Sequence, residues 1–264
     1  MGEPRGRDGG QAGIARDADL PDQLPRSARG RRLLSPEFVP AARIVIAVCV
    51  VVTAVLGIVF AHQSGPSRLD TAVYNWLDSE LGDHRRALWP LHGLGGFALV
   101  TLLTFALALI CLIMRRPRGA VLTVVAVVAA ALATEFVKPL VDRHFFTGLA
   151  YPSGHTTGIT SLAAVFAILL LGPLRPPLPA VIRVSLASAG ALLAAAVAVA
   201  LIVTNTHYFT DTVGGAGVGI SAALLTALII DRIASGPRAR TGRAQASAAS
   251  APDEAVSADR GISG

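Results

Sequence analysis

Long apolar stretches separated by short polar segments dominate the middle of the chain. Each of six stretches is close to the roughly 20 residues that an α-helix needs to cross a bilayer. They run from Ile44 to Ala61, Gly95 to Met114, Ala120 to Val141, Gly158 to Leu174, Val184 to Thr204 and Val213 to Ile230. The pattern predicts an all-α polytopic membrane protein, a bundle of six transmembrane helices with both chain ends on one side of the membrane.

The polar stretch between the first two predicted crossings, residues 62–94, has a different pattern. Its apolar positions recur at helical spacing among polar residues: Leu69, Val73, Trp76, Leu77 and Leu81. This spacing predicts an amphipathic helix that lies at the membrane interface. The segment also contains His62, His84 and His92, which belong to no motif and which we interpret as bystanders.

The two ends of the chain lack any apolar period. Residues 1–40 are rich in Gly, Arg, Asp and Pro, and residues 235–264 in Ala, Ser, Gly and Arg. Such compositions cannot bury enough apolar surface to fold, so both segments are predicted to be disordered tails. The predicted membrane core therefore comprises residues 41–234.

Composition and charge support the membrane assignment. Of the 264 residues, 53% are hydrophobic and only 15% are charged, which is too apolar for an ordinary soluble protein. Eighteen of the 23 basic residues lie in the two tails and in the turns on the same side. The positive-inside rule then makes both tails cytoplasmic, and the protein a multi-pass protein of the cell membrane. The net charge of +6 needs no nucleic-acid partner, because the bilayer surface accounts for it.

Ionisable groups gather at helix ends that the same count places on the extracytoplasmic face. Lys138, the only lysine, lies near the end of the third crossing and is followed by Arg143. Residues 152–155, Pro-Ser-Gly-His, directly precede the fourth crossing, and His207 and Asp211 lie between the fifth and sixth. Ionisable groups within a membrane are costly and usually functional, so we predict that these residues form one site.

Part of this set suits the binding of a phosphoryl group, which needs cations and backbone donors around its oxygens. Lys138 and Arg143 would supply positive charge. Ser153 and the amide of Gly154 lie at the start of a helix, where hydrogen bonds and the helix dipole favour an anion.

The remaining residues suit the chemical step. A neutral imidazole is a competent nucleophile near neutral pH, so His207 could attack phosphorus while Asp211, one helical turn later, fixes its tautomer. His155 would protonate the leaving oxygen and then activate the water that hydrolyses a phosphohistidine intermediate. No third ligand with suitable spacing joins Asp142 and His144, so no metal and no other cofactor are predicted.

Some of these groups also have a simpler structural interpretation. Lys138 could extend its ammonium to the membrane surface, or pair with Glu135 on the same helix face, and for that reason Glu135 is left out of the site. The four glycines between residues 214 and 219 fall in an apolar stretch, where small residues allow helices to pack closely.

The three groups of motif residues resemble those of the type 2 phosphatidic acid phosphatase family, which read K-x6-R-P, P-S-G-H and S-R-x5-H-x3-D. The likeness covers about residues 69–231. It implies a metal-independent lipid phosphatase fold shared with vanadium haloperoxidases. It also implies that His207 is the nucleophile, that His155 is the acid and that Asp211 is the partner of the nucleophile.

The chain departs from the family pattern at two positions where the family has arginines. Phe145 and Phe146 stand in place of Arg-Pro in the first motif, and Ala200 and Leu201 in place of Ser-Arg in the third. The loss of a charged donor costs on the order of 1.5 to 3 kcal/mol of interaction. The candidates to compensate are Arg143, Arg85, Arg86 and Asn205.

These observations predict a membrane-embedded phosphatase that hydrolyses a lipid phosphate or a polyprenyl diphosphate at the extracytoplasmic face. Two alternatives stay open: a lipid-phosphate-binding relative with weakened or lost catalysis, and a phosphotransferase that uses the same phosphohistidine. No paired half-repeats or broken midmembrane helices are found, which argues against a transporter. The sequence leaves the identity of the lipid and the oligomeric state open.

Overall fold

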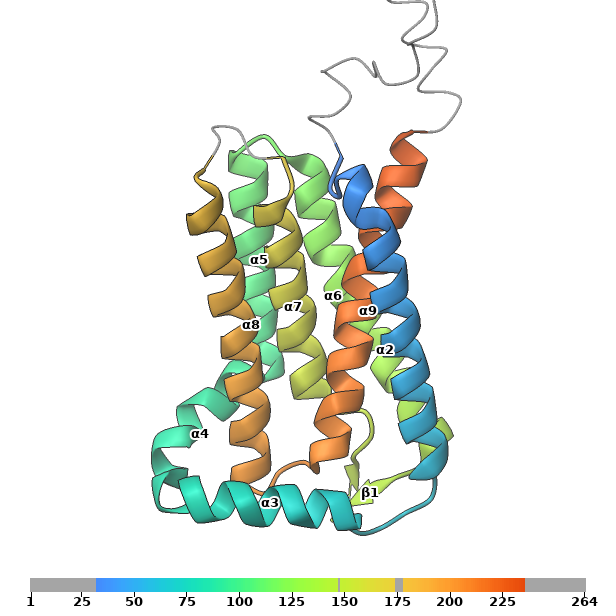
Figure 1. Cartoon of the computed structure of the whole chain (residues 1–264), viewed down its shortest axis with the longest axis vertical. Helices are drawn as coiled ribbons and strands as arrows, with labels where there is room; N and C mark the ends of the chain where they lie inside the picture. Colours follow the sequence, from blue (N-terminus) through green and yellow to red (C-terminus); the bar gives the residue numbers. More distant parts are fainter. Residues whose placement is uncertain (1–31, 147, 174–177, 236–264) are drawn as a thin grey trace, which may run out of the picture.

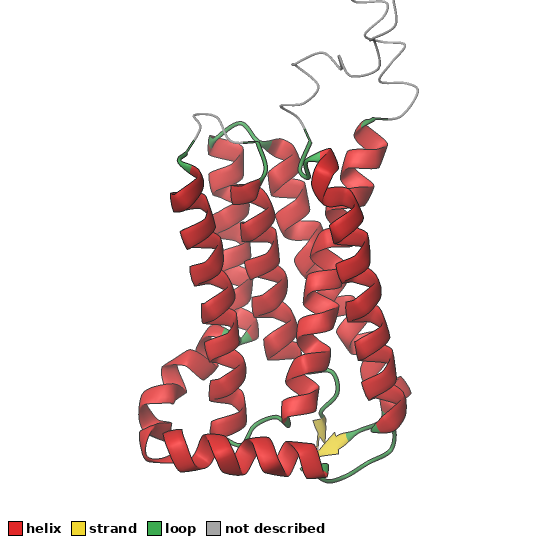
Figure 2. Ribbon diagram, in the orientation of Figure 1, coloured by secondary structure: helices red, strands yellow, loops and turns green. Residues whose placement is uncertain are grey.

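The computed structural model describes residues 32–146, 148–173 and 178–235, and within these ranges it is almost entirely helical (Figure 2). Six long helices run side by side (Figure 1). They are α2 (Val39–Val59), α5 (Phe97–Ile113), α6 (Pro117–Val141), α7 (Gly154–Leu171), α8 (Ala180–Val203) and α9 (Phe209–Ala234). The six predicted crossings are confirmed as helices, with bounds that differ from the prediction by at most five residues.

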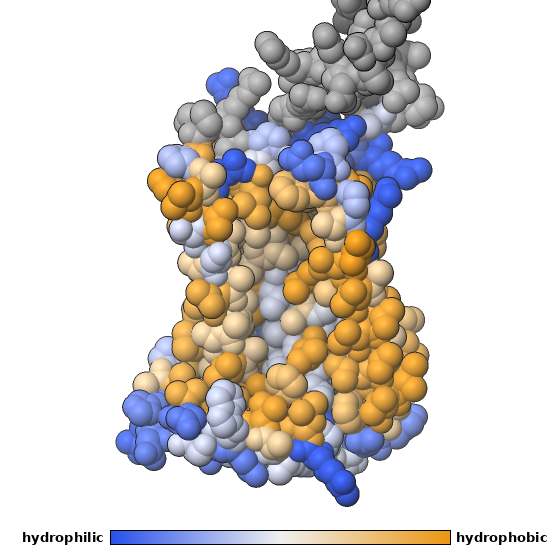
Figure 3. All heavy atoms as spheres, in the orientation of Figure 1, coloured by the Kyte–Doolittle hydropathy of each residue, from blue (hydrophilic) through white to orange (hydrophobic). Residues whose placement is uncertain are grey.

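The outer surface of the bundle suits a bilayer. Five of the long helices are both long and apolar enough to cross a membrane, and α5 follows the helical segment Arg68–Leu94 at a bend of 51°. Large apolar side chains point outward, among them Ile58, Phe105 and Leu132, which are 77%, 62% and 66% exposed. On the face that Figure 3 shows, apolar residues cover much of the middle, and hydrophilic residues gather at both ends. A water-soluble protein rarely exposes so continuous an apolar surface.

Short elements join the long helices. They are η1 (Pro36–Phe38), α3 (Arg68–Leu81), η2 (Gly82–His84), α4 (Arg85–Leu94) and a two-stranded antiparallel hairpin, β1 (His144–Phe145) with β2 (Gly148–Leu149). Helix α3 begins with a capping box in which Ser67 and Asp70 bond to each other's backbone amides. It lies across one end of the bundle, where Leu77 packs against Ile202 and Val203 of α8 (Figure 1). The predicted amphipathic helix is therefore confirmed.

Helix α9 lies at the centre and packs against α2, α6 and α7. Glycines permit this close approach, because a Cβ atom at Gly217 would lie 2.4 Å from Thr53 Oγ1 and one at Gly219 would lie 2.3 Å from Thr160 Oγ1. The interpretation of the glycines between residues 214 and 219 as a packing surface is thus confirmed.

The two ends of the described chain meet at the end of the bundle opposite α3 (Figure 1). The Asp231 carboxylate accepts hydrogen bonds from the backbone amides of Leu33 and Leu34, at 2.9 to 3.1 Å. Both leucines are buried, so the folded core begins before residue 41, the boundary predicted from the sequence. Residues 1–31 and 236–264, which make up most of the predicted tails, lie outside the described residues, and their disorder stays a prediction.

Candidate active site

The predicted site residues come from separate segments that meet at the α3 end of the bundle. Lys138 is in the last turn of α6, His155 is in the first turn of α7, and His207 is in the connection between α8 and α9. The ring centroids of His155 and His207 are 5.9 Å apart. The helix count placed both histidines on one face of the membrane, and in the structure both lie close together at one end of the bundle.

The start of α7 is built by Ser153, which caps the helix. Its hydroxyl oxygen accepts hydrogen bonds from the amide and the hydroxyl of Thr156, at 3.3 and 3.2 Å. The Ser153 amide in turn donates to the carbonyl of Asp211 at 3.0 Å, which ties this turn to the start of α9. The Ser153 side chain is fully buried, so its first role in this structure is to shape the turn that presents Gly154 and His155.

His207 lies outside both neighbouring helices because α8 ends abruptly. Asn205 adopts a left-handed conformation (φ 53°), which asparagine tolerates, and the amide and hydroxyl of Thr206 bond back to the carbonyl of Leu201. His207 Nδ1 is 3.9 Å from Asp211 Oδ2, within ion-pair range but longer than a hydrogen bond. Nδ1 has no hydrogen-bond partner among the described residues, so the carboxylate is the nearest acceptor toward which it can turn.

Lys138 directs its ammonium toward the start of α7. A Cβ atom placed on Gly154 would lie 3.9 Å from Lys138 Nζ. The ammonium is also 2.7 Å from Glu135 Oε1, which is the ion pair considered from the sequence. The Lys138 side chain is 21% exposed and that of Glu135 is 69% exposed, so the carboxylate lies at the rim while the ammonium lies beside the site.

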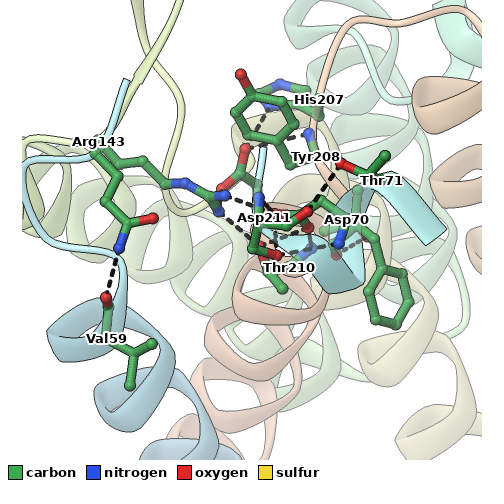
Figure 4. A network of polar contacts seen from close by, with 12 residues as sticks. Val59, Asp70, Thr71, Arg143, His207, Tyr208, Thr210 and Asp211 are labelled. Carbon is green, nitrogen blue, oxygen red and sulfur yellow. Dashed lines mark hydrogen bonds and ion pairs between the residues drawn. The ribbon is translucent and has the colours of Figure 1, made fainter. Parts of the chain in front are cut away.

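Arg143, which we predicted to bind the substrate phosphate, lies wholly inside the protein. Its Nη1 donates to Asp211 Oδ1 and to Thr210 Oγ1, both at 2.6 Å, and its Nη2 donates to Asp70 Oδ2 at 2.7 Å (Figure 4). The rings of Phe60 and Tyr208 lie 4.5 and 4.6 Å from its guanidinium carbon. Two carboxylates already match its charge, so the geometry favours an architectural role for Arg143 over the predicted phosphate contact.

Asp70 links α3 to this network and was not predicted from the sequence. Its side chain is 1% exposed, and it accepts hydrogen bonds from the amide and hydroxyl of Thr210, both at 2.9 Å, and from Ser67 and Arg143. Burial alone would raise the pKa of this carboxyl, but the hydrogen bonds from Thr210, Ser67 and Arg143 outweigh it and lower the pKa below its usual value. Asp70 is therefore held as a carboxylate.

Two of the other candidates to replace the family's arginines, Arg85 and Asn205, lie in different surroundings. Arg85 bonds to Asp78 and to the hydroxyl of Tyr74 on the exposed side of α3. Asn205 lines a cavity of about 230 Å³ together with His207 and residues of α3, so it lies near the proposed nucleophile. Burial raises the pKa of the Tyr208 phenol, also in this wall, which keeps it neutral.

A third histidine joins the site, although its position in the sequence gave no signal. His92, in the last turn of α4, has its ring centroid 5.3 Å from that of His155, at an angle of 65°. We had interpreted His92 as a bystander, because it belongs to no motif and lies more than 60 residues before His155. Within the described ranges, no three His, Cys, Asp or Glu side chains are arranged to hold a metal ion.

An apolar groove begins beside these residues and runs along the bundle. It has a volume of about 490 Å³ and lies between α7, α8 and α9. Five alanines of α8 form one wall: Ala187, Ala191, Ala194, Ala195 and Ala198. At the site end the groove is lined by Thr156, the neighbour of His155, and by Phe209, which also lines the cavity of His207. Figure 3 shows this face of the molecule hollowed between α8 and α9.

Comparison with known proteins agrees with the motifs. Residues 135–234 match the PAP2 superfamily. The structure is similar to that of a transmembrane PAP2-type phosphatidylglycerolphosphate phosphatase from Bacillus subtilis, with a TM-score of 0.56 and 13% sequence identity. The similarity covers 69% of this chain and 93% of the Bacillus chain. No curated protein sequence matches this chain significantly.

The resemblance to the type 2 phosphatidic acid phosphatase family, predicted from the motifs, is therefore confirmed by the match of residues 135–234 to the PAP2 superfamily. The bundle has the fold of a transmembrane PAP2-type phosphatase.

Proposed function

We propose that the protein is a membrane-embedded phosphatase that removes phosphate from a lipid phosphate or a polyprenyl diphosphate at the extracytoplasmic face, through a phosphohistidine intermediate. The observation that carries the proposal is the meeting of His155 and His207, with ring centroids 5.9 Å apart, beside the ammonium of Lys138. Three groups from three different helices or connections thereby lie near the start of α7.

In the proposed first step, His207 attacks phosphorus. Its Nδ1 faces the Asp211 carboxylate, so Nε2 is the nitrogen free to act as nucleophile. The bond between Nε2 and phosphorus forms as the bond from phosphorus to the lipid oxygen breaks. His155, in its protonated form, gives its proton to that leaving oxygen.

In the second step, water hydrolyses the phosphohistidine. His155, now neutral, takes a proton from a water molecule whose oxygen attacks phosphorus, and the bond between phosphorus and Nε2 breaks. Inorganic phosphate leaves, and both histidines return to their starting protonation states. The two steps use one acid-base residue in both directions, which requires only that His155 reach both the leaving oxygen and the incoming water.

Binding of the phosphoryl group rests on the start of α7 and on Lys138. The amides of the first helical turn and the positive end of the helix dipole favour an anion at this position. The Lys138 ammonium adds a full charge beside Gly154. In this scheme Arg143 does not contact the phosphoryl group. It acts through Asp211, because it binds the carboxylate that faces His207.

The apolar groove favours a substrate with a long hydrocarbon tail. Its wall of alanines leaves space within the membrane that begins beside Thr156 and Phe209, close to the two histidines. The surrounding lipid is as apolar as the groove, so a tail gains little hydrophobic free energy by entering it. The groove would instead position the tail through van der Waals contacts. A tail in this groove would place the attached phosphate at the site end.

Sidedness follows from charge together with the fold. Both ends of the described chain lie at the end of the bundle opposite the site (Figure 1), and the described helix ends and turns there carry Arg43, Arg115, Arg116, Arg118, Arg183 and Arg232. The positive-inside rule favours a cytoplasmic position for that end and an extracytoplasmic position for the site.

A second candidate function is a lipid-phosphate-binding relative without turnover. Phe145 and Leu201, at the positions of the family's arginines, favour it, since Leu201 is fully buried among apolar side chains and brings no charge to the site. A phosphotransferase, the third alternative, would differ only in the acceptor that attacks the phosphohistidine.

One experiment separates these functions. Phosphate release is measured for the detergent-purified protein with a panel of phosphatidic acid, phosphatidylglycerolphosphate and polyprenyl diphosphate, each with and without an added alcohol acceptor. A phosphatase releases phosphate, and His207→Ala and His155→Ala abolish the release, whereas His84→Ala, which alters an exposed histidine of the same outer segment, leaves it unchanged. Binding of the lipids without release supports the binding protein, and a phosphorylated acceptor supports the transferase.

A further inference from the structure

We propose that His92 is a further phosphate-binding residue of this site, and that its imidazole supplies part of the hydrogen bonding that the arginine at the Leu201 position supplies in the family pattern. The proposal rests on the proposed function, because it assumes that the site receives a phosphoryl group. It adds a residue that lies outside the segment matched to the superfamily, residues 135–234.

The ring of His92 contacts that of His155, which in turn lies beside the ring of His207. Its centroid is 5.3 Å from that of His155, and the centroid of His155 is 5.9 Å from that of His207. His92 also contacts Trp89 edge to face, with ring centroids 4.9 Å apart. The two ring contacts together position the His92 imidazole.

The bend between α4 and α5 brings His92 to this place. Gly95 lies at the bend, is buried, and contacts the first turn of α7 so closely that a Cβ atom would lie 3.1 Å from His155 Cβ and 3.2 Å from the His155 carbonyl oxygen. The same Cβ atom would lie 3.1 Å from Val197 of α8. The absence of a side chain at residue 95 lets the end of α4 sit directly on the residue that we assign as the acid.

The end of α4 also packs at the position of the missing arginine. Leu201 is fully buried in an apolar cluster with Ile159, Ala194 and Val197, and Leu94 packs against this cluster. An arginine at residue 201 would bring a charge to this position, whereas the leucine gives the last turn of α4 an apolar surface to pack against. This packing of Leu94 keeps His92, two residues earlier on α4, beside His155.

The His92 imidazole is free to bind a ligand. Across the described part of the chain, neither of its ring nitrogens has a hydrogen-bond or ion-pair partner, and its ring contacts those of Trp89 and His155. The residue is half-buried, so a substrate can reach it. An imidazole donates an N–H to a phosphate oxygen in its neutral form and from both nitrogens when protonated.

The test compares His92→Ala and His92→Arg with His84→Ala as the matched control. Two quantities are measured for each variant: KM and kcat for dioctanoyl phosphatidic acid in detergent, and the dissociation constant of orthovanadate, which mimics a phosphoryl group in transfer. The loss of a hydrogen bond to a charged group predicts that His92→Ala raises KM and weakens vanadate binding by about tenfold or more. His92→Arg, which restores a donor, should return both values to within about threefold of the wild type.

Either of two results overturns the proposal: values for His92→Ala that equal those for His84→Ala, or a loss in His92→Ala that His92→Arg fails to reverse although both variants melt at the wild-type temperature. The proposed function fails separately, if the wild-type protein releases no phosphate from any lipid of the panel. In that case vanadate binding still decides the role of His92. Tenfold weaker binding of vanadate by His92→Ala than by the wild type supports the role. Equal binding by the two proteins, or no binding by the wild type, refutes it.

Discussion

Replacement of Asp70 by alanine is expected to destabilise the protein strongly, although Asp70 belongs to none of the motifs. The carboxylate accepts five hydrogen bonds: two from Thr210, two from Ser67 and one from Arg143. Asp70→Ala removes all five acceptor contacts. It leaves the Arg143 guanidinium, which is 0% exposed, with one carboxylate where it had two.

The expected magnitude follows from these contacts. Each buried donor left without an acceptor costs about 1 to 3 kcal/mol, and the loss of one partner from a buried ion pair costs about 3 to 5 kcal/mol. For a folded core of this size, that corresponds to a fall in Tm of roughly 6 to 20 °C. Asp70→Asn should cost less, since an asparagine oxygen still accepts from the Thr210 amide.

The assay is the Tm of the detergent-purified protein, followed by intrinsic fluorescence. Asp78→Ala is the matched control, because Asp78 is on the same helix, two turns later, and pairs with Arg85 at the surface. Surface ion pairs contribute little, so this variant should melt with the wild type. Equal Tm values for Asp70→Ala and Asp78→Ala would refute the reasoning, as would strict additivity of Asp70→Ala and Arg143→Ala in the double variant.

The remaining predictions concern acid, packing and substrate. The pKa of Asp70 is lowered by folding, so its contribution to stability is full above its ordinary value of about 3.9 and is lost as the pH falls through the lowered value. Acidification should accordingly lower the Tm of the wild type more than that of Asp70→Asn, and parallel curves would contradict this. Gly214→Ala should lower the free energy of unfolding by about 1 to 3 kcal/mol, seen as a fall in Tm, because its Cβ would lie 2.5 Å from the Tyr151 ring. Gly148→Ala is the control: its Cβ would meet no atom within 4 Å, so its Tm should equal that of the wild type. Ala195→Trp, in the groove wall, should raise KM for long-chain lipid phosphates and spare dioctanoyl substrates, and no chain-length dependence would argue against the groove as the tail site.

Much of the fold could be predicted because membrane insertion imposes simple rules. The six apolar stretches had to be helices, since no water is present to satisfy the backbone, and their number determined which connections share a face. That count alone placed His155 and His207 together, and the structure has their rings 5.9 Å apart. The short motifs then identified the family without knowledge of the packing.

The role of Arg143 could not be predicted in this way. Its position five residues after Lys138, in a loop where a phosphate-binding cation was expected, indicated a ligand for the substrate. The decisive partner, Asp70, is 73 residues earlier, in a segment predicted as an interfacial amphipathic helix, from which no site residue was predicted. A pairing between two loops or helix ends leaves no period in the sequence, so only the tertiary structure reveals it.

His92 was missed for a related reason. The approach of α4 to the first turn of α7 depends on the bend at Gly95 and on the apolar contact between Leu94 and the Leu201 cluster. Both are properties of packing between distant segments. The leucine at position 201, where the family pattern has an arginine, was visible in the sequence, but it indicated only the absence of a charge and not that α4 packs against this position.

The ion pair between Asp70 and Arg143 also constrains how relatives of this protein can diverge. A charge in a dry interior that loses its counterpart is costly, so neither residue can be exchanged alone without a penalty. Substitutions at positions 70 and 143 are therefore expected to occur together during evolution, with an apolar pair as the natural replacement. Relatives that retain a buried acidic residue at position 70 should retain an arginine at position 143. The pair would then mark a shared architecture at the α3 end of the bundle.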